Sequence, residues 1–143
     1  MEQRNIQELL DRLTPGDVLI LDAPSGFGKT LSLQKQKRER PDEILVLSYE
    51  TLAREISGYL KKHRSAKHLT EDFASLLCRC KVLAIEDVDF LAGKTSTLAE
   101  ICLLVNCISR RKTTAVVMTG IDIYDKMPYF VDYLERASYV KLG

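Results

Sequence analysis

The sequence predicts a three-layer α/β fold with a five-stranded, mainly parallel sheet between helices. Short apolar runs alternate along the chain with segments of helical period, as they do where helices join parallel strands. The apolar runs are continuous, which is typical of strands that are buried on both faces. One run leads into a glycine-rich loop and then a helix, the order expected of a phosphate-binding loop. At 143 residues the chain is long enough for one core, so residues 1–143 are expected to form a single domain.

Five apolar runs are the strand candidates, and the last of them has the weakest pattern: residues 18–21, 44–47, 81–85, 115–119 and 138–142. Helical periodicity marks the segments around them. The first helix has apolar residues at the i, i+3, i+4, i+7 spacing from Ile6 to Leu13 and stops at Pro15. Further helices are expected over residues 30–39, 52–60, 69–77 and 97–108. Thr70 is the expected N-cap of one, and Thr97 with Glu100 forms the expected capping box of another.

Composition and charge exclude several classes of protein and favour the cytoplasm. A formal net charge of +1 attracts no nucleic acid by itself, so any basic surface must be local. No stretch approaches the ~18 apolar residues of a membrane span, and the first residues contain no apolar signal segment. No membrane partner is therefore expected. The cysteines have no metal-site spacing with the histidines and are expected to be reduced structural residues: Cys78, Cys80, Cys102 and Cys107.

The stretch DAPSGFGKT, residues 22–30, nearly matches the phosphate-binding pattern G-x-x-x-x-G-K-[ST]. Ala23 replaces the first glycine, a change that is tolerable if its φ stays negative. Lys29 would reach the β- and γ-phosphates, and the Thr30 hydroxyl would ligate Mg²⁺. The residues expected to bind a nucleotide are Ala23, Pro24, Ser25, Gly26, Phe27, Gly28, Lys29 and Thr30. The alternative is a glycine-rich turn with a purely structural role.

Two adjacent acids, Glu86 and Asp87, follow the strand candidate at 81–85. The carboxyl end of a parallel strand lies at the same sheet edge as the phosphate-binding loop, so Glu86 is placed to hold Mg²⁺ or its water shell. Asp87 is then placed to orient an attacking water. The alternative is that the two acids only cap a turn after the strand.

The segment around these acids, LAIEDVDFLAGK, resembles the Walker B region of the DnaA family of bacterial replication initiators, which are AAA+ ATPases. APSGFGKTLSLQ is similar to the family's P-loop and helix, ILVLSYETLAREI to its second strand and helix, and AVVMTG to its sensor 1 strand. The resemblance covers residues 17–142 in the same order. It implies a P-loop NTPase fold of the AAA+/ASCE type, ATP and Mg²⁺ as ligands, and a role in DNA replication or its regulation.

The chain departs from the family pattern at the acid pair, where Glu-Asp stands in place of Asp-Asp. Glu86 reaches ~1.5 Å further toward a metal ion than an aspartate would. Asp87 reaches correspondingly less than the glutamate that most AAA+ proteins carry. Because a displacement of about 1 Å can cost about a hundredfold in rate, ATP binding is expected to survive better than hydrolysis.

Two further departures concern sensor 1 and the arginine finger. The resemblance implies that either Thr119 makes the sensor 1 contact to the γ-phosphate or its water, or Asp122 is displaced by one residue and the sensor 1 site is blunted. Arg136 is the candidate arginine finger, which would reach the nucleotide of a neighbouring subunit; a plain surface arginine is the alternative. The family's helical lid would follow Gly143, so hydrolysis by this domain as an isolated monomer is expected to be slow.

A local basic stretch with the single acid Glu55 offers cations to phosphates: Arg54, Lys61, Lys62, Arg64 and Lys67. In the family this segment leads into helices that touch single-stranded DNA, so the resemblance implies such a contact. Tyr59 and His63 could supply a stacking ring. A solvated helix face explains the same charges.

Three functions remain open from the sequence. The first is a DnaA-like domain that binds Mg²⁺ and ATP, hydrolyses ATP slowly, and associates with replication proteins, with itself or with single-stranded DNA. The second is a non-hydrolysing interaction module whose fold is stabilised by the nucleotide. The third is a small-molecule kinase, although the chain has no recognisable acceptor site.

Overall fold

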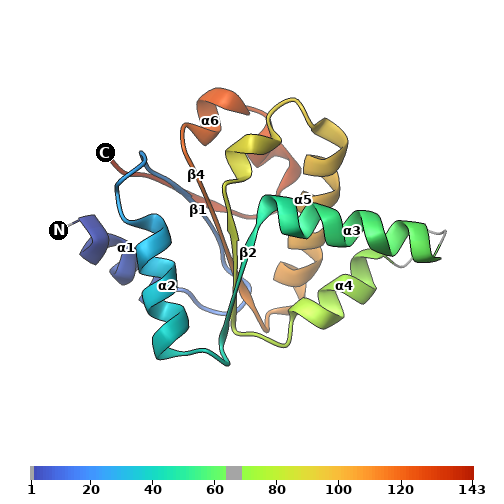
Figure 1. Ribbon diagram of the computed structural model, residues 1–143, viewed down its shortest axis with the longest axis horizontal. Coiled ribbons are helices and arrows are strands. Elements are labelled where there is room, and N and C mark those ends of the chain that lie inside the picture. Colours follow the sequence, from blue (N-terminus) through green and yellow to red (C-terminus); the bar gives the residue numbers. More distant parts are fainter. Residues whose placement is uncertain (1, 64–68) are drawn as a thin grey trace.

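The computed structural model describes residues 2–63 and 69–143 and has the expected α/β architecture (Figure 1). Its strands are β1 (Val18–Asp22), β2 (Ile44–Ser48), β3 (Val82–Glu86), β4 (Ala115–Gly120) and β5 (Ser138–Lys141). They form one sheet in the order β2-β3-β4-β1-β5, and every neighbouring pair is parallel. All five predicted strands are confirmed, and the sheet is entirely rather than mainly parallel.

Helices cover both faces of this sheet. Figure 1 shows α1 and α2 on one face and α3, α4 and α5 on the other. The helices are α1 (Glu2–Asp11), α2 (Lys29–Glu39), α3 (Tyr49–His63), α4 (Leu69–Leu77), α5 (Thr95–Arg111) and α6 (Ile123–Lys126). The short helix α6 and two 3-10 turns, η1 (Val88–Leu91) and η2 (Phe130–Tyr133), were not expected from the sequence. None of the described helices is both long and apolar enough to cross a lipid bilayer.

Two apolar cores, one on each face of the sheet, hold the three layers together. Because side chains alternate along a strand, β1 sends Val18 and Ile20 to one core and Leu19 and Leu21 to the other. The larger core lies under α3, α4 and α5, and the smaller one under α1 and α2. Burial on both faces is the reason that the strands read as continuous apolar runs.

The expected starts of two helices are wrong. Helix α5 begins at Thr95, because the N–H of Leu98 already donates to the carbonyl of Lys94 at 3.0 Å. Thr97 therefore lies in the first turn and cannot form the expected capping box. Thr70 lies inside α4 rather than before it.

The cysteines are free thiols. Cys102 is buried in the larger core, as expected, and burial raises its pKa to about 12. The other three, Cys78, Cys80 and Cys107, are half-buried against the same core. A protonated thiol is a poor nucleophile, so Cys102 is a structural residue.

The strand order reverses at β1. After β1 the chain crosses to β2 at one edge of the sheet, returns through β3 and β4, and then crosses to β5 on the other side of β1. In α/β folds a ligand crevice lies outside the carboxyl ends of the strands at such a switch point. The glycine-rich loop after β1 therefore lies where a ligand site is expected.

Candidate active site

The loop after β1 encloses a pocket at the carboxyl edge of the sheet. The pocket has a volume of about 290 Å³ and is lined by residues 24–31, Asp87 and Ile121. Gly26 (φ 83°) and Gly28 (φ 93°) adopt a left-handed conformation that other residues rarely adopt. Gly28 is also the N-cap of α2, so the unpaired N–H groups and the positive end of that helix border the pocket. Such a helix start is suited to bind an anion.

Ala23, which replaces the first glycine of the phosphate-binding pattern, is accommodated without strain. Its side chain is buried, and its N–H donates to the carbonyl of Gly120 at 3.1 Å. The described non-glycine residues with positive φ are Asp87, Lys112 and Asp122, so Ala23 keeps a negative φ. The missing glycine therefore does not distort the loop.

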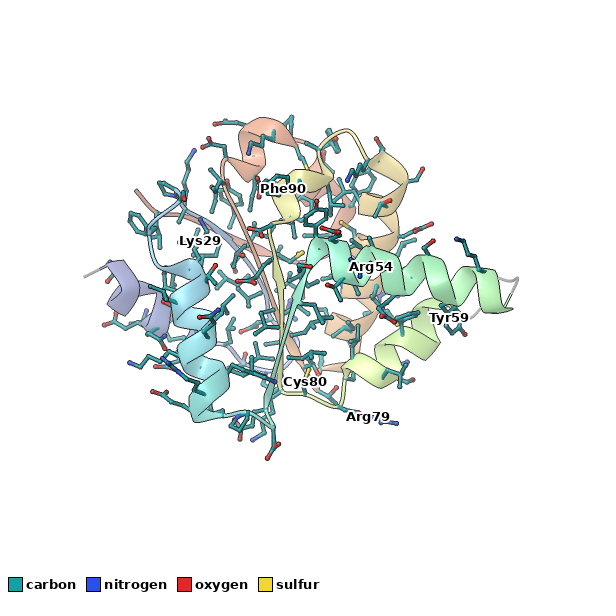
Figure 2. All side chains as sticks on the ribbon, in the orientation of Figure 1. Lys29, Arg54, Tyr59, Arg79, Cys80 and Phe90 are labelled. Carbon is teal, nitrogen blue, oxygen red and sulfur yellow. The ribbon has the colours of Figure 1, made fainter. Side chains whose placement is uncertain are left out.

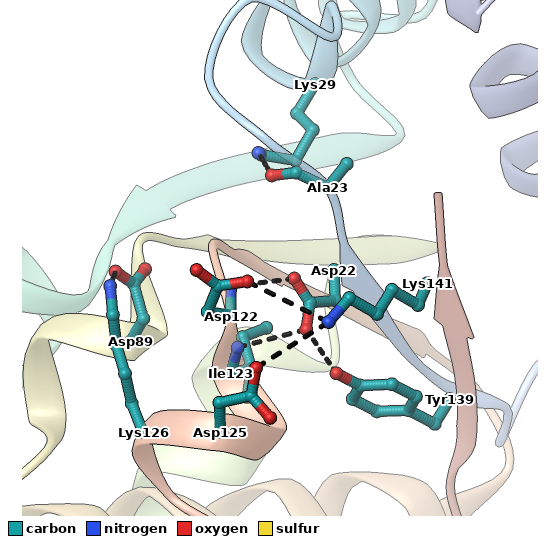
Figure 3. Close-up of polar contacts among 10 residues, drawn as sticks. All are labelled: Asp22, Ala23, Lys29, Asp89, Asp122, Ile123, Asp125, Lys126, Tyr139 and Lys141. Atoms are coloured by element: carbon teal, nitrogen blue, oxygen red, sulfur yellow. Dashed lines mark hydrogen bonds and ion pairs between the residues drawn. The ribbon is translucent and has the colours of Figure 1, made fainter. Parts of the chain in front are cut away.

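Lys29 opens α2, and its ammonium group lies against the carbonyls of the loop that precedes the helix (Figures 2 and 3). Its Nζ donates to the carbonyl of Ala23 and to that of Pro24, the latter at 3.2 Å. Burial lowers the pKa of Lys29, while nearby carboxylates, Asp22 foremost, raise it. A phosphate in the pocket would offer this ammonium group a charged acceptor in place of two neutral ones.

Thr30 and Glu86, the two expected Mg²⁺ ligands, are in contact. The Thr30 hydroxyl on α2 lies close enough to the Glu86 carboxyl group at the end of β3 to affect its pKa, although β4 separates β3 from β1 in the sheet. Burial raises the pKa of Glu86, the nearby Thr30 hydroxyl lowers it, and the charge of Asp87 raises it. Hydroxyl and carboxylate oxygens are ligands that Mg²⁺ takes together with waters and phosphates. These residues therefore fit a Mg²⁺ ion.

Asp87 lies at the wall of the pocket. Its backbone is left-handed, with φ 61° and ψ 39°, and its exposed carboxylate borders the pocket. This conformation costs free energy in a non-glycine residue, although aspartate tolerates it better than most. The turn leads the chain directly into η1 and leaves the carboxylate beside the phosphate-binding loop. The water-orienting role expected of Asp87 stays a prediction.

The two sensor candidates lie in different surroundings. Thr119 is 2% exposed within β4, where it pairs with Leu21 of β1. Asp122 is exposed, and its carboxylate lies 3.8 Å from Nζ of Lys141. The pocket wall at this point is formed by Ile121, a residue that no sequence motif singled out. Whether Thr119 or Asp122 contacts a γ-phosphate stays a prediction.

Arg136 lies at the opposite edge of the sheet from the loop. One of its guanidinium nitrogens is 4.0 Å from a carboxylate oxygen of Asp17, which comes just before β1, whereas the loop follows the far end of β1. Arg136 is exposed there. A contact between Arg136 and a nucleotide therefore needs a second subunit, as its expected role requires.

The expected basic stretch is described only in part. Arg54 and Lys61 of α3 are exposed, and Arg54 forms an ion pair with Glu50 at 3.3 Å. An exposed pair of this kind adds little stability, so Arg54 is available to a phosphate. The remaining residues of that prediction lie outside the described side chains: Lys62, His63, Arg64 and Lys67.

Phe90, in the turn after β3, is an exposed ring at the carboxyl edge of the sheet that the sequence did not single out. Phe90 is 59% exposed and stacks on Tyr49, with ring centroids 5.6 Å apart and planes at 10°. Lys94 Nζ lies 5.5 Å from the centroid of the Tyr49 ring. Tyr59, the ring expected to stack on a base, instead packs edge-on against Phe73 at 5.2 Å and joins the core. Figure 2 shows Phe90 at the edge of the sheet that carries Lys29, away from Cys80 and Arg79.

Two acids that the sequence interpretation did not single out are buried beside the pocket. Asp22, at the end of β1, is 1% exposed, and Asp89, in η1, is 4% exposed. Asp89 pairs with Nζ of Lys126 at 2.9 Å, while its Oδ1 has no hydrogen-bond partner among the described residues. Each stands in or directly after an apolar run. That position was the available signal, because a buried acid requires partners.

A family model described as the bacterial DnaA ATPase domain matches residues 4–139. Among curated proteins, no sequence matches the chain.

Solved structures share the fold at low sequence identity. Domain III of the Thermotoga maritima replication initiation protein DnaA is 20% identical over 99% of this chain and 60% of that chain, with a TM-score of 0.68. The replication initiator DnaA bound to AMPPCP and single-stranded DNA is 20% identical over 98% and 44%, with a TM-score of 0.69. The DnaC helicase loader is 13% identical over 98% and 87%, with a TM-score of 0.61. The chain thus spans less than two thirds of the length of these DnaA chains.

Proposed function

The chain belongs to the bacterial DnaA ATPase domain family, and from that premise we propose that it binds ATP with Mg²⁺ in the pocket after β1 and hydrolyses it slowly. We further propose that nucleotide binding serves the initiation of DNA replication or its regulation. The similar structures include an initiator bound to AMPPCP and a helicase loader, which supports this setting.

Different residues around the pocket are proposed to bind the phosphates and the metal ion. Backbone N–H groups of Ser25, Gly26 and Gly28 and the positive end of α2 bind the phosphates. Lys29 exchanges the carbonyls of Ala23 and Pro24 for oxygens of the β- and γ-phosphates. Thr30 and Glu86 hold Mg²⁺, which neutralises phosphate charge when it is bound.

The observation that carries this proposal is the proximity of the Thr30 hydroxyl to the Glu86 carboxyl group, which is close enough to lower the pKa of Glu86. It joins the phosphate-binding loop to the acid strand across β4, so the two groups that a Mg²⁺ ion needs lie within reach of one another. A glycine-rich turn with a purely structural role, or acids that only cap a turn, would not require this contact.

Hydrolysis is expected to be slow because the side chain of Asp87 is shorter than that of a glutamate. Its carboxylate borders the pocket and can orient a water, but it reaches about one C–C bond, ~1.5 Å, less far than a glutamate. Positioning errors of about 1 Å cost about a hundredfold in rate. ATP binding does not depend on that distance, so binding and turnover are affected separately.

Titration with ATP and ADP in the presence of Mg²⁺, read by calorimetry and by phosphate release, tests the proposal. Lys29→Ala should weaken ATP binding about 10- to 100-fold, because a charge-assisted contact to phosphate is lost. Lys35→Ala is the matched control, since Lys35 is an exposed lysine of the same helix. Absence of ATP binding by the unaltered protein would refute the proposal.

Asp87→Asn separates an ATPase from a non-hydrolysing interaction module. If Asp87 orients the attacking water, the variant should lose phosphate release while it still binds ATP. Unchanged phosphate release would show that Asp87 does not orient the attacking water. Absence of release in both the unaltered protein and the variant would favour the non-hydrolysing interaction module. Turnover that requires an added metabolite would instead favour a small-molecule kinase.

A second proposal concerns single-stranded DNA, the ligand of one similar initiator structure. The exposed ring of Phe90 and the cation of Arg54 offer stacking and a phosphate contact. Phe90→Ala should weaken binding of a fluorescent oligo-dT about tenfold, as measured by anisotropy at fixed salt. Leu76→Ala is the control, because Leu76 is an exposed apolar residue of similar exposure on α4. Equal binding by both variants would exclude Phe90 from the contact.

A third proposal is self-association that brings Arg136 to a neighbour's nucleotide. Phosphate release per molecule should then rise with protein concentration, and Arg136→Ala should abolish that rise. A rate independent of concentration would leave Arg136 as a surface residue.

A further inference from the structure

Asp22 is a buried carboxylate at the end of β1, directly before the phosphate-binding loop. Burying a charge is costly unless hydrogen bonds replace its water. Figure 3 shows that this carboxylate is surrounded by donors. The N–H of Asp122 donates to Oδ1 at 2.8 Å, the N–H of Ile123 donates to Oδ2 at 3.0 Å, and the Tyr139 hydroxyl also donates to Oδ2.

These donors lie on both sides of β1. Asp122 and Ile123 follow β4, which pairs with one side of β1, and Tyr139 belongs to β5, which pairs with the other. The backbone carbonyl of Asp22 also accepts the N–H of Leu142 at 2.8 Å. Residue 22 therefore fixes both neighbouring segments at the point where the phosphate-binding loop begins.

The segment at the end of β4, residues 120–123, is held in one conformation by its contacts. Asp122 is left-handed, with φ 49° and ψ 42°, and this turn accompanies two consecutive N–H groups directed at one carboxylate. A Cβ on Gly120 would lie 2.7 Å from Cγ1 of Ile123 and 2.8 Å from Oδ1 of Asp89. Between these fixed points, Ile121 forms part of the pocket wall.

The same part of the pocket wall contains Asp87, to which the proposed function assigns the attacking water. Asp87 and Ile121 come from the ends of β3 and β4, whereas the phosphate-binding loop follows β1. An attacking water lies next to the γ-phosphate, so this wall belongs to the γ-phosphate end of the site.

We infer that Asp22 is a positioning residue: its carboxylate holds residues 120–123 so that the pocket distinguishes ATP from ADP, although Asp22 itself does not line the pocket. This inference rests on the proposed nucleotide binding. It extends that proposal, because it makes a residue outside the phosphate-binding loop responsible for the preference for a triphosphate.

The three hydrogen bonds to the side chain of Asp22 require a carboxylate at this position. All three partners are donors, and burial together with the hydrogen bond to Asp22 raises the pKa of Tyr139 to about 12, so its hydroxyl keeps its proton. An asparagine has the same shape, but its NH₂ group would face at least one of these donors. Tyr139→Phe removes one donor and leaves both backbone bonds to the carboxylate.

The test compares dissociation constants for ATP and ADP, with Mg²⁺, in the full chain and three variants. Asp22→Asn should weaken ATP binding about tenfold and ADP binding less than about twofold. Tyr139→Phe should lower the preference for ATP about threefold. Lys141→Met is the control, because it removes exposed ion pairs to Asp122 and Asp125 at 3.8 Å and should leave the preference unchanged.

Amide hydrogen exchange without nucleotide provides an independent measurement. Asp22→Asn should accelerate exchange at Asp122 and Ile123 and leave the amides of α5 unchanged. Equal loss of ATP and ADP affinity would show a merely structural role and overturn the inference. So would fast exchange at these amides with an unchanged preference for ATP.

Failure of the proposed function would be visible in the unaltered protein alone, which would then bind neither nucleotide; the nucleotide part of this inference would fall with it. A specific failure of the inference leaves tight binding in the unaltered protein and an unchanged preference in the variants. If Asp22→Asn does not fold, Tyr139→Phe decides the question, since it keeps the carboxylate buried among its two backbone donors.

Discussion

At the scale of single residues, Gly120 is a glycine that leaves no room for a side chain. A Cβ there would meet Cγ1 of Ile123 at 2.7 Å and Oδ1 of Asp89 at 2.8 Å. Gly120→Ala should therefore lower the free energy of unfolding by about 1–3 kcal/mol, because buried neighbours must move. Urea unfolding followed by circular dichroism measures the change.

Gly58→Ala is the matched control for that prediction. Gly58 lies in α3, and nothing lies within 4 Å of a Cβ built on it. The same substitution there should raise the free energy of unfolding by about 0.4–1 kcal/mol, because alanine restricts the unfolded chain. Similar effects at both positions would contradict the crowding at Gly120.

Tyr139 predicts a pH dependence of stability at the same scale. Burial first, and then the hydrogen bond to Asp22, raise its pKa to about 12, whereas a tyrosine in an unfolded chain titrates near about 10. Below pH ~10 the phenol is protonated in both states and adds no pH dependence. From there to about pH 12 the unfolded chain loses this proton first, so the stability falls as the pH rises.

Tyr139→Phe lacks the titrating group and is the reference for that effect. The free energy of unfolding of the unaltered protein, minus that of the variant, should be constant below pH ~10 and should fall above it. Denaturant unfolding at several alkaline pH values measures the difference. A constant difference over the whole range would contradict the buried environment of the phenol.

At the scale of the helices, α3 and α5 differ in how they begin. The N–H of Thr51 donates to Oγ of Ser48 at 3.0 Å, so Ser48 caps α3, whereas α5 starts after Lys94 without a side-chain cap. Ser48→Ala should therefore cost about 1 kcal/mol. Thr97→Ala should stay within about 0.5 kcal/mol, because Thr97 is not the cap that its sequence pattern suggests. If both variants lose the same free energy of unfolding in urea, Thr97 caps α5 as its sequence pattern suggests.

At the scale of the whole molecule, ligand binding at the switch point should stabilise the entire fold. With Mg²⁺ and ATP at about 100 times the dissociation constant, the free energy of unfolding should rise by about 2.7 kcal/mol. The melting temperature should rise accordingly for the unaltered protein and for Lys35→Ala. Lys29→Ala should show a much smaller shift at the same ATP concentration. Equal shifts in all three proteins would indicate binding outside the pocket.

The sequence was sufficient to predict an element where neighbouring residues alone determine its conformation. The strand runs were found because burial on both faces makes them continuously apolar, and the loop was found because Gly26 and Gly28 allow the left-handed turns it needs. Helix starts were less accurate, since the backbone of Lys94 begins α5 before the polar side chains that suggested a cap.

The amino-acid sequence by itself determined the α/β class, the glycine-rich loop after β1 and the acid pair Glu86 and Asp87, because these depend on neighbours along the chain. Only the tertiary structure decided which distant groups meet. The proximity of Thr30 to Glu86, the exposure of Phe90 rather than Tyr59, and the place of Arg136 depend on strand order. The Asp22 carboxylate accepts hydrogen bonds from Asp122 and Tyr139, which lie 100 and 117 positions further along the chain. No local pattern encodes such contacts, because they arise where two strands pack on either side of a third.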